Sequence, residues 1–202
     1  MNTKVRDFFY HNYRVGRVCL IGSNDPVYEL IREGQSGLTP DGKASKWNHA
    51  FLMGSRREEV IYICESDIHI NLKRFRLISG PQESRIEKWC EDSIEHACVL
   101  GMHLSQAQED GLLAKALELC YDEEYSYPLA GLVGTLIAIA TNTVNKKNLF
   151  NDKHAIQCST LVRMCYQSIN ADPLKGMMDD LSNTSPERIY QSTQFSFREE
   201  LP

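Results

Sequence analysis

The hydrophobic pattern of this 202-residue chain changes period once, near residue 83. Before that point, short segments rich in β-branched and aromatic residues alternate with polar residues, which is typical of strands. After it, apolar residues recur every three or four positions, which is typical of amphipathic helices. A run of strands followed by a run of helices favours an α+β fold, with an antiparallel sheet packed against helices, over an alternating α/β fold.

Four segments of the first half predict strands, namely residues 16–22, Trp47–Met53, Glu59–Cys64 and Ile68–Ile78. The polar link GSRR joins the second segment to the third, which predicts an antiparallel hairpin with its turn near Ser55–Arg57. Residues 23–46 carry several glycines and prolines among polar residues. Because a long irregular segment inside a compact domain is usually functional, we interpret residues 23–46 as an active-site or lid loop.

The second half predicts helices over residues 83–100, 105–120 and 158–169, with a further helix beginning at Pro128. Ser105 followed by Gln108 has the spacing of a capping box. Ser185 and Pro186 have the pattern of an N-cap and first turn of a short helix.

Composition restricts the class of protein. With 42% hydrophobic and 24% charged residues, we expect one soluble globular domain over residues 1–202. The net charge of −5 disfavours nucleic-acid binding. The longest uncharged stretch, residues 125–145, has too short an apolar centre to insert stably into a membrane. We find no signal peptide and therefore expect a cytoplasmic protein.

The seven cysteines are odd in number, and no pair has CxxC spacing. This usage favours free thiols in a reducing compartment, and we expect no metal or other cofactor. Cys158 is the strongest candidate nucleophile, because it opens the predicted helix CSTLVRMCYQSI. The unpaired amides at a helix N-terminus favour a thiolate and can also hold an oxyanion. From position alone, Cys158 is equally readable as the first residue of an apolar stripe.

A cysteine nucleophile needs a base, and the base needs an orienting partner. His49 lies in the first strand of the predicted hairpin, and that hairpin places it opposite Cys64 or Glu65. One hairpin therefore predicts both the base and its carboxylate partner. His154, four residues before Cys158, is an alternative base.

Three segments in this order, WNHAFLM, VIYICES and QCSTLVRMCYQ, resemble the permuted branch of the NlpC-like, papain-fold cysteine peptidases, the YiiX/YaeF-like group. The third is similar to the helix start CSELV of that family. The segments YDEEYSYPLAG, SPERIYQSTQF and RVCLIGSND also resemble family segments, so the similarity extends over about residues 16–197.

The resemblance implies a papain-like core in circularly permuted order. It implies a cysteine hydrolase in which Cys158, His49 and Glu65 act as nucleophile, base and orienting residue. Gln157, Ser159 and Tyr121 become candidates for oxyanion or substrate binding. The expected substrate is a small peptide or an acyl amide, such as a cell-wall peptide. An acyltransferase or thioesterase acting on acyl lipids, and a binding protein without catalysis, remain alternatives, and the sequence does not indicate an oligomeric state.

Overall fold

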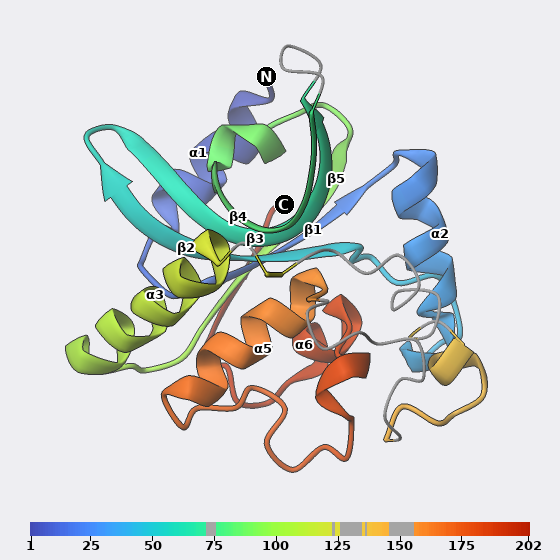
Figure 1. Ribbon diagram of the computed structural model, residues 1–202. Coiled ribbons are helices and arrows are strands. Elements are labelled where there is room, and N and C mark those ends of the chain that lie inside the picture. Colours follow the sequence, from blue (N-terminus) through green and yellow to red (C-terminus); the bar gives the residue numbers. More distant parts are fainter. Residues whose placement is uncertain (72–75, 123, 126–134, 136, 146–155) are drawn as a thin grey trace.

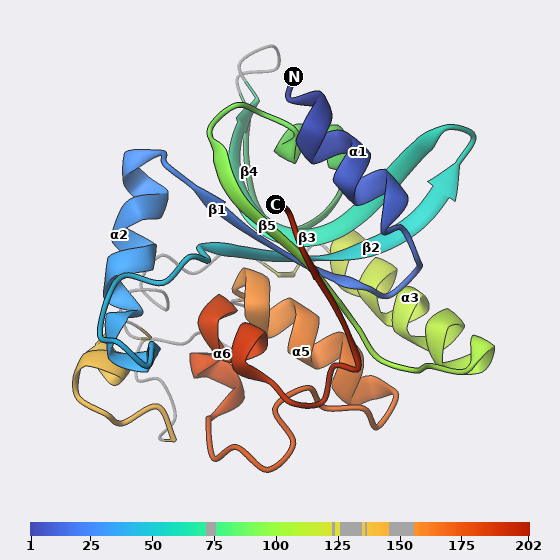
Figure 2. The same ribbon diagram turned by 180° about the vertical axis from the view of Figure 1, so that it is seen from behind.

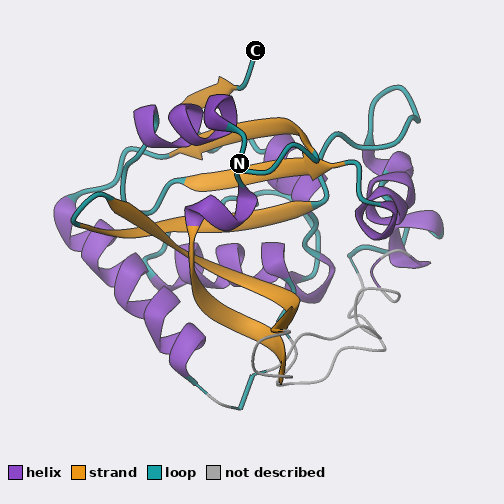
Figure 3. Cartoon of the chain, turned by 90° about the horizontal axis from the view of Figure 1, so that it is seen from above, coloured by secondary structure: helices purple, strands orange, loops and turns teal. Residues whose placement is uncertain are grey.

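The protein is described by a computed structural model that covers residues 1–71, 76–122, 124–125, 135, 137–145 and 156–202. Its centre is a six-stranded antiparallel sheet with the strand order β4-β3-β2-β1-β5-β6 (Figure 1). The strands are β1 Val18–Ser23, β2 His49–Arg57, β3 Val60–Asn71, β4 Arg76–Arg85, β5 Ile94–Gly101 and β6 Phe197–Glu200. Seen from above, one pair of strands runs obliquely across the others, so the sheet is strongly twisted (Figure 3).

Helices cover both faces of this sheet, as the two opposite views show (Figures 1 and 2). On one face, α3 (Gln106–Tyr121), α5 (Cys158–Ser168) and α6 (Pro186–Gln191) bury Leu20, Leu52 and Cys64. On the other face, α1 (Thr3–His11) and the 3-10 turn η2 (Ile86–Trp89) bury Cys19, Phe51 and Ile63. The alternation of neighbouring residues between two cores follows from the two-residue period of a strand.

Several predictions of local structure are confirmed. The helix predicted over residues 105–120 is α3, and its Ser105 and Gln108 form the expected capping box. The helix beginning at Cys158 is α5. Ser185 caps α6, where its hydroxyl accepts a hydrogen bond from the backbone N–H of Arg188. The α+β class and the antiparallel sheet packed against helices are also confirmed.

The predicted hairpin turn was wrong by a few residues. The segment GSRR continues β2 to Arg57, and the turn falls at Glu58, whose backbone has φ 54°. As a result, β2 and β3 pair with Phe51 opposite Glu65 and Leu52 opposite Cys64. His49 is therefore the diagonal neighbour of Glu65 on the same face of the sheet, and not its direct partner.

Two further predictions were wrong about element type. The segment Ile68–Ile78 is not one strand, because its two ends belong to the neighbouring antiparallel strands β3 and β4. The helix predicted over residues 83–100 is instead the end of β4, the turn η2 and the strand β5. Strand β5 lies between β1 and β6 and is buried on both faces from Ala97 to Gly101. A strand buried on both faces has no polar alternation, so its apolar pattern resembles that of a buried helix.

The segment 23–46, predicted as an irregular loop, contains the helix α2 (Pro26–Gly34) and the 3-10 turn η1 (Ser36–Leu38). Most of the helix predicted from Pro128, together with His154, lies outside the described residues. In the described part of the chain, no helix has the length and apolar character needed to cross a membrane.

Two close approaches fix the middle of the fold. A Cβ atom added at Gly22 in β1 would lie 1.9 Å from the backbone carbonyl oxygen of Lys46, so only glycine allows the chain to pass there. On β3, the Ser66 hydroxyl donates to the carbonyl oxygen of Ile156, two residues before α5 begins. Strand β3 thus carries Glu65, and its next residue, Ser66, holds the start of α5 through this hydrogen bond.

Candidate active site

The structure brings His49 and Glu65 into contact within the sheet. The His49 Nε2 atom lies 3.0 Å from Glu65 Oε2, and the side chains are 3% and 0% exposed. His49 is the first residue of β2, and Glu65 lies in the middle of β3. An imidazole held on one nitrogen by a buried carboxylate has a fixed ring orientation, with the other nitrogen directed away from that carboxylate.

Two residues of η2 complete the surroundings of Glu65. The indole Nε1–H of Trp89 donates to Glu65 Oε2 at 2.7 Å, and its ring lies 4.7 Å from the His49 ring, centroid to centroid. The ammonium group of Lys88 donates to Glu65 Oε1 at 2.8 Å and to Asp67 Oδ2 at 2.7 Å. Both oxygens of Glu65 therefore have partners, as a buried carboxylate requires.

These contacts lower the pKa of Glu65 to about 2. Burial alone would raise this pKa, but the hydrogen bond with His49 and the positive charge of Lys88 outweigh that effect. Glu65 is consequently a carboxylate over the whole physiological pH range, and it can stabilise a protonated His49.

The Cys158 thiol completes the group from the opposite half of the chain. Burial raises the pKa of Cys158, but the charge and hydrogen bond of His49 and the backbone N–H groups of Ala50 and Ser159 lower it further, and the net shift is downward. No side chain caps the N-terminus of α5, where Gln157 is the N-cap residue. The amides of the first turn are therefore not used by a side-chain cap.

The contact with Cys158 changes the pKa of His49 in the opposite direction. Burial lowers its pKa, but the charge of Cys158 and hydrogen bonds with Cys158 and Glu65 raise it, to about 10. The lowered pKa of the Cys158 thiol and the raised pKa of the His49 imidazole together correspond to a thiolate–imidazolium pair. The other cysteines for which a shift is resolved change in the opposite direction. Burial raises the pKa of Cys19, Cys90, Cys98 and Cys165, and a hydrogen bond with Cys64, together with burial, raises that of Cys120.

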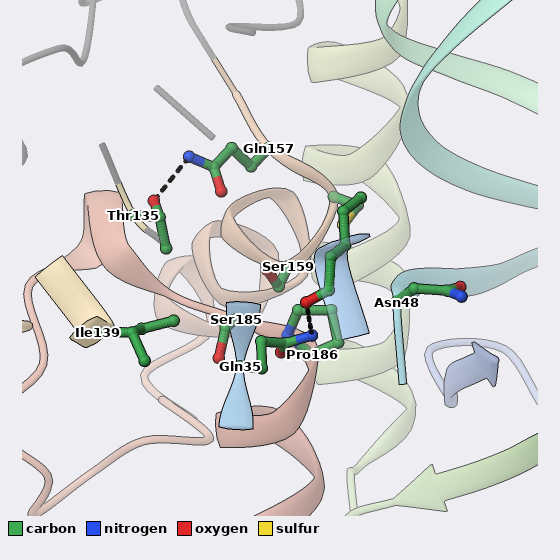
Figure 4. A pocket seen from close by; sticks show the side chains of 10 residues that line it. Gln35, Asn48, Thr135, Ile139, Gln157, Ser159, Ser185 and Pro186 are labelled. Carbon is green, nitrogen blue, oxygen red and sulfur yellow. Dashed lines mark hydrogen bonds between the residues drawn. The ribbon is translucent and has the colours of Figure 1, made fainter. Parts of the chain in front are cut away.

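A small pocket is lined in part by Cys158, and Figure 4 shows the side chains around it. Its lining combines apolar side chains, including Ile31, Ile139 and Pro186, with polar side chains, including Gln35, Thr135 and Ser185. The lining comes from α2 and the residue that follows it, from the starts of α5 and α6, and from the described part of residues 135–139. Residues 23–46, which we interpreted as an active-site or lid loop, thus supply Ile31 and Gln35 to this wall.

The remaining predicted site residues have different surroundings. Gln157 and Ser159 line the pocket, but the Gln157 amide donates to Thr135 Oγ1 at 2.9 Å and the Ser159 hydroxyl donates to the Thr184 carbonyl at 2.7 Å (Figure 4). Tyr121 is not brought to this group. It is 70% exposed at the end of α3, and its hydroxyl donates to Glu83 on β4 at 3.1 Å.

Sequence reasoning missed four residues that surround this group, namely Tyr28, Asp67, Lys88 and Trp89. Asp67 follows Glu65 by two positions, so the period of a strand places both carboxylates on one face and could have identified it. Lys88 and Trp89 fell inside a wrongly predicted helix. Tyr28 lies on α2, where its hydroxyl is 3.4 Å from Asp67 Oδ1 and its ring meets Trp89 edge to face.

The fold and this group of side chains define an α+β protein with a buried Cys-His-Glu arrangement beside a pocket. A similar fold occurs in the solved structure of the metalloprotein yiiX from Escherichia coli O157:H7, a DUF1105 protein. The likeness has a TM-score of 0.52 at 13% sequence identity and covers 91% of this chain and 94% of yiiX. No family model matches the chain, and no curated protein matches it.

We also compared the described side chains with the donor set that a metal ion needs. Among the described residues, no group of three or more His, Cys, Asp or Glu side chains is arranged to hold a metal ion. Two carboxylates of the candidate site, Glu65 and Asp67, are joined by Lys88, whose ammonium group lies within 2.8 Å of both. A lysine in this position takes the place that a cation would need.

Proposed function

We propose that this protein is a cysteine hydrolase that cleaves an amide bond of a small peptide or acyl amide through an acyl-enzyme. The observation that carries the proposal is the buried Cys158–His49–Glu65 arrangement, in which the pKa of the thiol is lowered and that of the imidazole is raised. Shifted pKa values of this kind beside a pocket are typical of catalytic groups. The order of the three residues along the chain supports a papain-like core in permuted order, as in the YiiX/YaeF-like group.

The chemistry follows from the charges. The Cys158 thiolate attacks the carbonyl carbon of the amide, and the C=O π electrons move to the oxygen to give a tetrahedral oxyanion. The imidazolium of His49 then gives its proton to the leaving nitrogen as the C–N bond breaks, which leaves a thioester on Cys158. A water molecule, deprotonated by neutral His49, attacks the thioester and restores the thiolate–imidazolium pair with release of the acid.

The backbone amides at the start of α5, which no side chain caps, suit the oxyanion. Preorganised backbone N–H groups of this kind contribute about 10²–10³-fold in rate. Glu65 and the Trp89 ring hold His49, whose side chain is 3% exposed. We assign the orienting role to Glu65, because its carboxylate is the partner of the ring nitrogen.

The test is turnover of a Cys158→Ala variant with a panel of fluorogenic dipeptide and acyl amides. Because Ala fits the space of Cys and the helix begins there in either case, we expect a folded protein with turnover reduced by about 10⁴-fold or more. The matched control is Cys165→Ala, which changes the same residue type about two helical turns further along α5. Full activity of Cys158→Ala would refute the assignment.

An acyltransferase or thioesterase is the second candidate, because the wall of the pocket beside Cys158 includes the apolar residues Ile31, Ile139 and Pro186. Both candidates form a thioester at Cys158 and differ in the donor. Mass spectrometry of the intact protein after incubation with peptide amides or with acyl thioesters separates them, because only the true donor class adds its acyl mass to Cys158. A protein that acquires neither mass would instead be a binding protein.

A further inference from the structure

The cluster of charges behind His49 extends beyond the three residues used above. Lys88 on η2 lies between two carboxylates of the same strand, Glu65 and Asp67, with distances of 2.8 and 2.7 Å. The Lys88 side chain is 21% exposed, whereas the carboxylates are 0% and 9% exposed. Two nearly buried carboxylates two residues apart on one strand face repel each other unless a cation lies between them.

We propose that Lys88 is a positioning residue of this site: its ammonium group joins Glu65 to Asp67 and keeps Glu65 ionised and directed toward His49. This inference rests on the proposed cysteine-hydrolase function and assigns to that site a residue outside the Cys-His-Glu group. Lys88 acts through Glu65, because its ammonium group donates hydrogen bonds to the carboxylates of Glu65 and Asp67.

The groups that face this cluster come from five elements of the described chain. They are His49 on β2, Glu65 and Asp67 on β3, Lys88 on η2, Tyr28 on α2 and Cys158 on α5. The Lys88 charge lowers the pKa of Glu65, and the charges of Glu65 and Asp67 in turn raise the pKa of Lys88 against the effect of burial. Glu65 and Lys88 therefore hold each other in the ionised form.

Loss of the Lys88 charge has a predictable direction. In Lys88→Met the two carboxylates face each other without a cation, so Glu65 takes up a proton at higher pH than in the natural chain. A protonated Glu65 no longer stabilises the imidazolium of His49, and the Cys158 thiolate then loses its counter-ion. The thiolate should consequently disappear at a higher pH as the solution is acidified.

The experiment measures the rate of alkylation of Cys158 by iodoacetamide between pH 3 and pH 9, with the labelled cysteine identified by peptide mass spectrometry. For Lys88→Met we expect the acid limb of the rate profile to move up by about one pH unit, which is about a tenfold slower reaction on that limb. Lys88→Arg keeps the charge, and it should recover most of the natural profile.

The double variant Lys88→Met/Asp67→Asn provides the decisive comparison. It removes one positive and one negative charge, so the repulsion on Glu65 is relieved and the acid limb should return toward that of the natural chain. A merely structural role of Lys88 predicts the opposite, because two lost contacts would disturb the site more than one. The double variant also keeps the inference testable if Lys88→Met alone does not fold.

An acid limb that moves by less than about half a unit in Lys88→Met, or that moves further in the double variant, would overturn the inference. These outcomes differ from failure of the proposed function. If Cys158 is a thiolate at low pH but no amide or acyl donor reacts, the hydrolase proposal fails and the role of Lys88 stands. If turnover is found and the alkylation profile does not change in the Lys88 variants, the hydrolase proposal stands and the role of Lys88 fails.

Discussion

Replacing Glu65 by Gln tests how much the buried carboxylate contributes to the charge of His49. The substitution keeps the shape of the side chain but removes its negative charge from a position with 0% exposure. A hydrogen bond to a charged group contributes about 1.5–3 kcal/mol. At about 1.4 kcal/mol for each pKa unit, its loss lowers the pKa of His49 by about one to two units. The starting value is about 10, so the histidine of the variant should lose its proton one to two units closer to neutral pH.

The measurement is a proton NMR titration of the His49 ring, assigned by the signal that is absent from a His49→Gln variant. Glu87→Gln is the matched control. Glu87 lies on η2 beside Lys88, but its carboxylate accepts a hydrogen bond from Tyr10 at 2.5 Å and not from His49. We expect the control to titrate like the natural chain. A His49 titration in Glu65→Gln that stays within about half a unit of the natural chain would contradict the electrostatic reasoning.

Two further predictions concern stability. Gly22→Ala places a methyl group 1.9 Å from the Lys46 carbonyl oxygen, and the backbone must shift because neither atom can rotate away. We expect the free energy of unfolding in urea to fall by about 3 kcal/mol or more. A decrease below about 1 kcal/mol would contradict the close approach. Glu65 has a pKa of about 2 in the folded chain against a reference of 4.5, so its contribution of a few kcal/mol is present above pH 4.5 and is lost as the pH falls through 2. The difference in Tm between the natural chain and Glu65→Gln should therefore narrow as the pH falls from 6 to 2, and a constant difference would refute this linkage.

The sequence predicted those parts of the fold whose signals are local. The capping box at Ser105 and the cap at Ser185 depend on residues three positions apart, and both are present as expected. The β5 strand could not be recognised in this way. Its faces are buried by α1 on one side and by α3 and α5 on the other, and these helices come from distant parts of the chain.

In the candidate site, too, the sequence predicted the contact within one hairpin and missed the contacts made by more distant elements. The contact between His49 and Glu65 was expected from a hairpin, and it is present although the hairpin register differs from the one expected. The contact tolerates that difference because diagonal neighbours on one face are within reach of long side chains. Lys88 and Trp89 were not predictable, because η2 reaches Glu65 only after the chain has returned along the antiparallel strand β4.

The division of the reactive pair between the two halves of the chain also affects when the protein becomes reactive. The base and its carboxylate are carried by β2 and β3, whereas the sulfur arrives on α5, which Ser66 fastens to β3 through the carbonyl of Ile156. A newly made chain whose later helices have not yet docked holds a histidine without a thiol and a thiol of ordinary acidity. For the hydrolase that we propose, the thiolate–imidazolium pair thus forms only when the fold is complete.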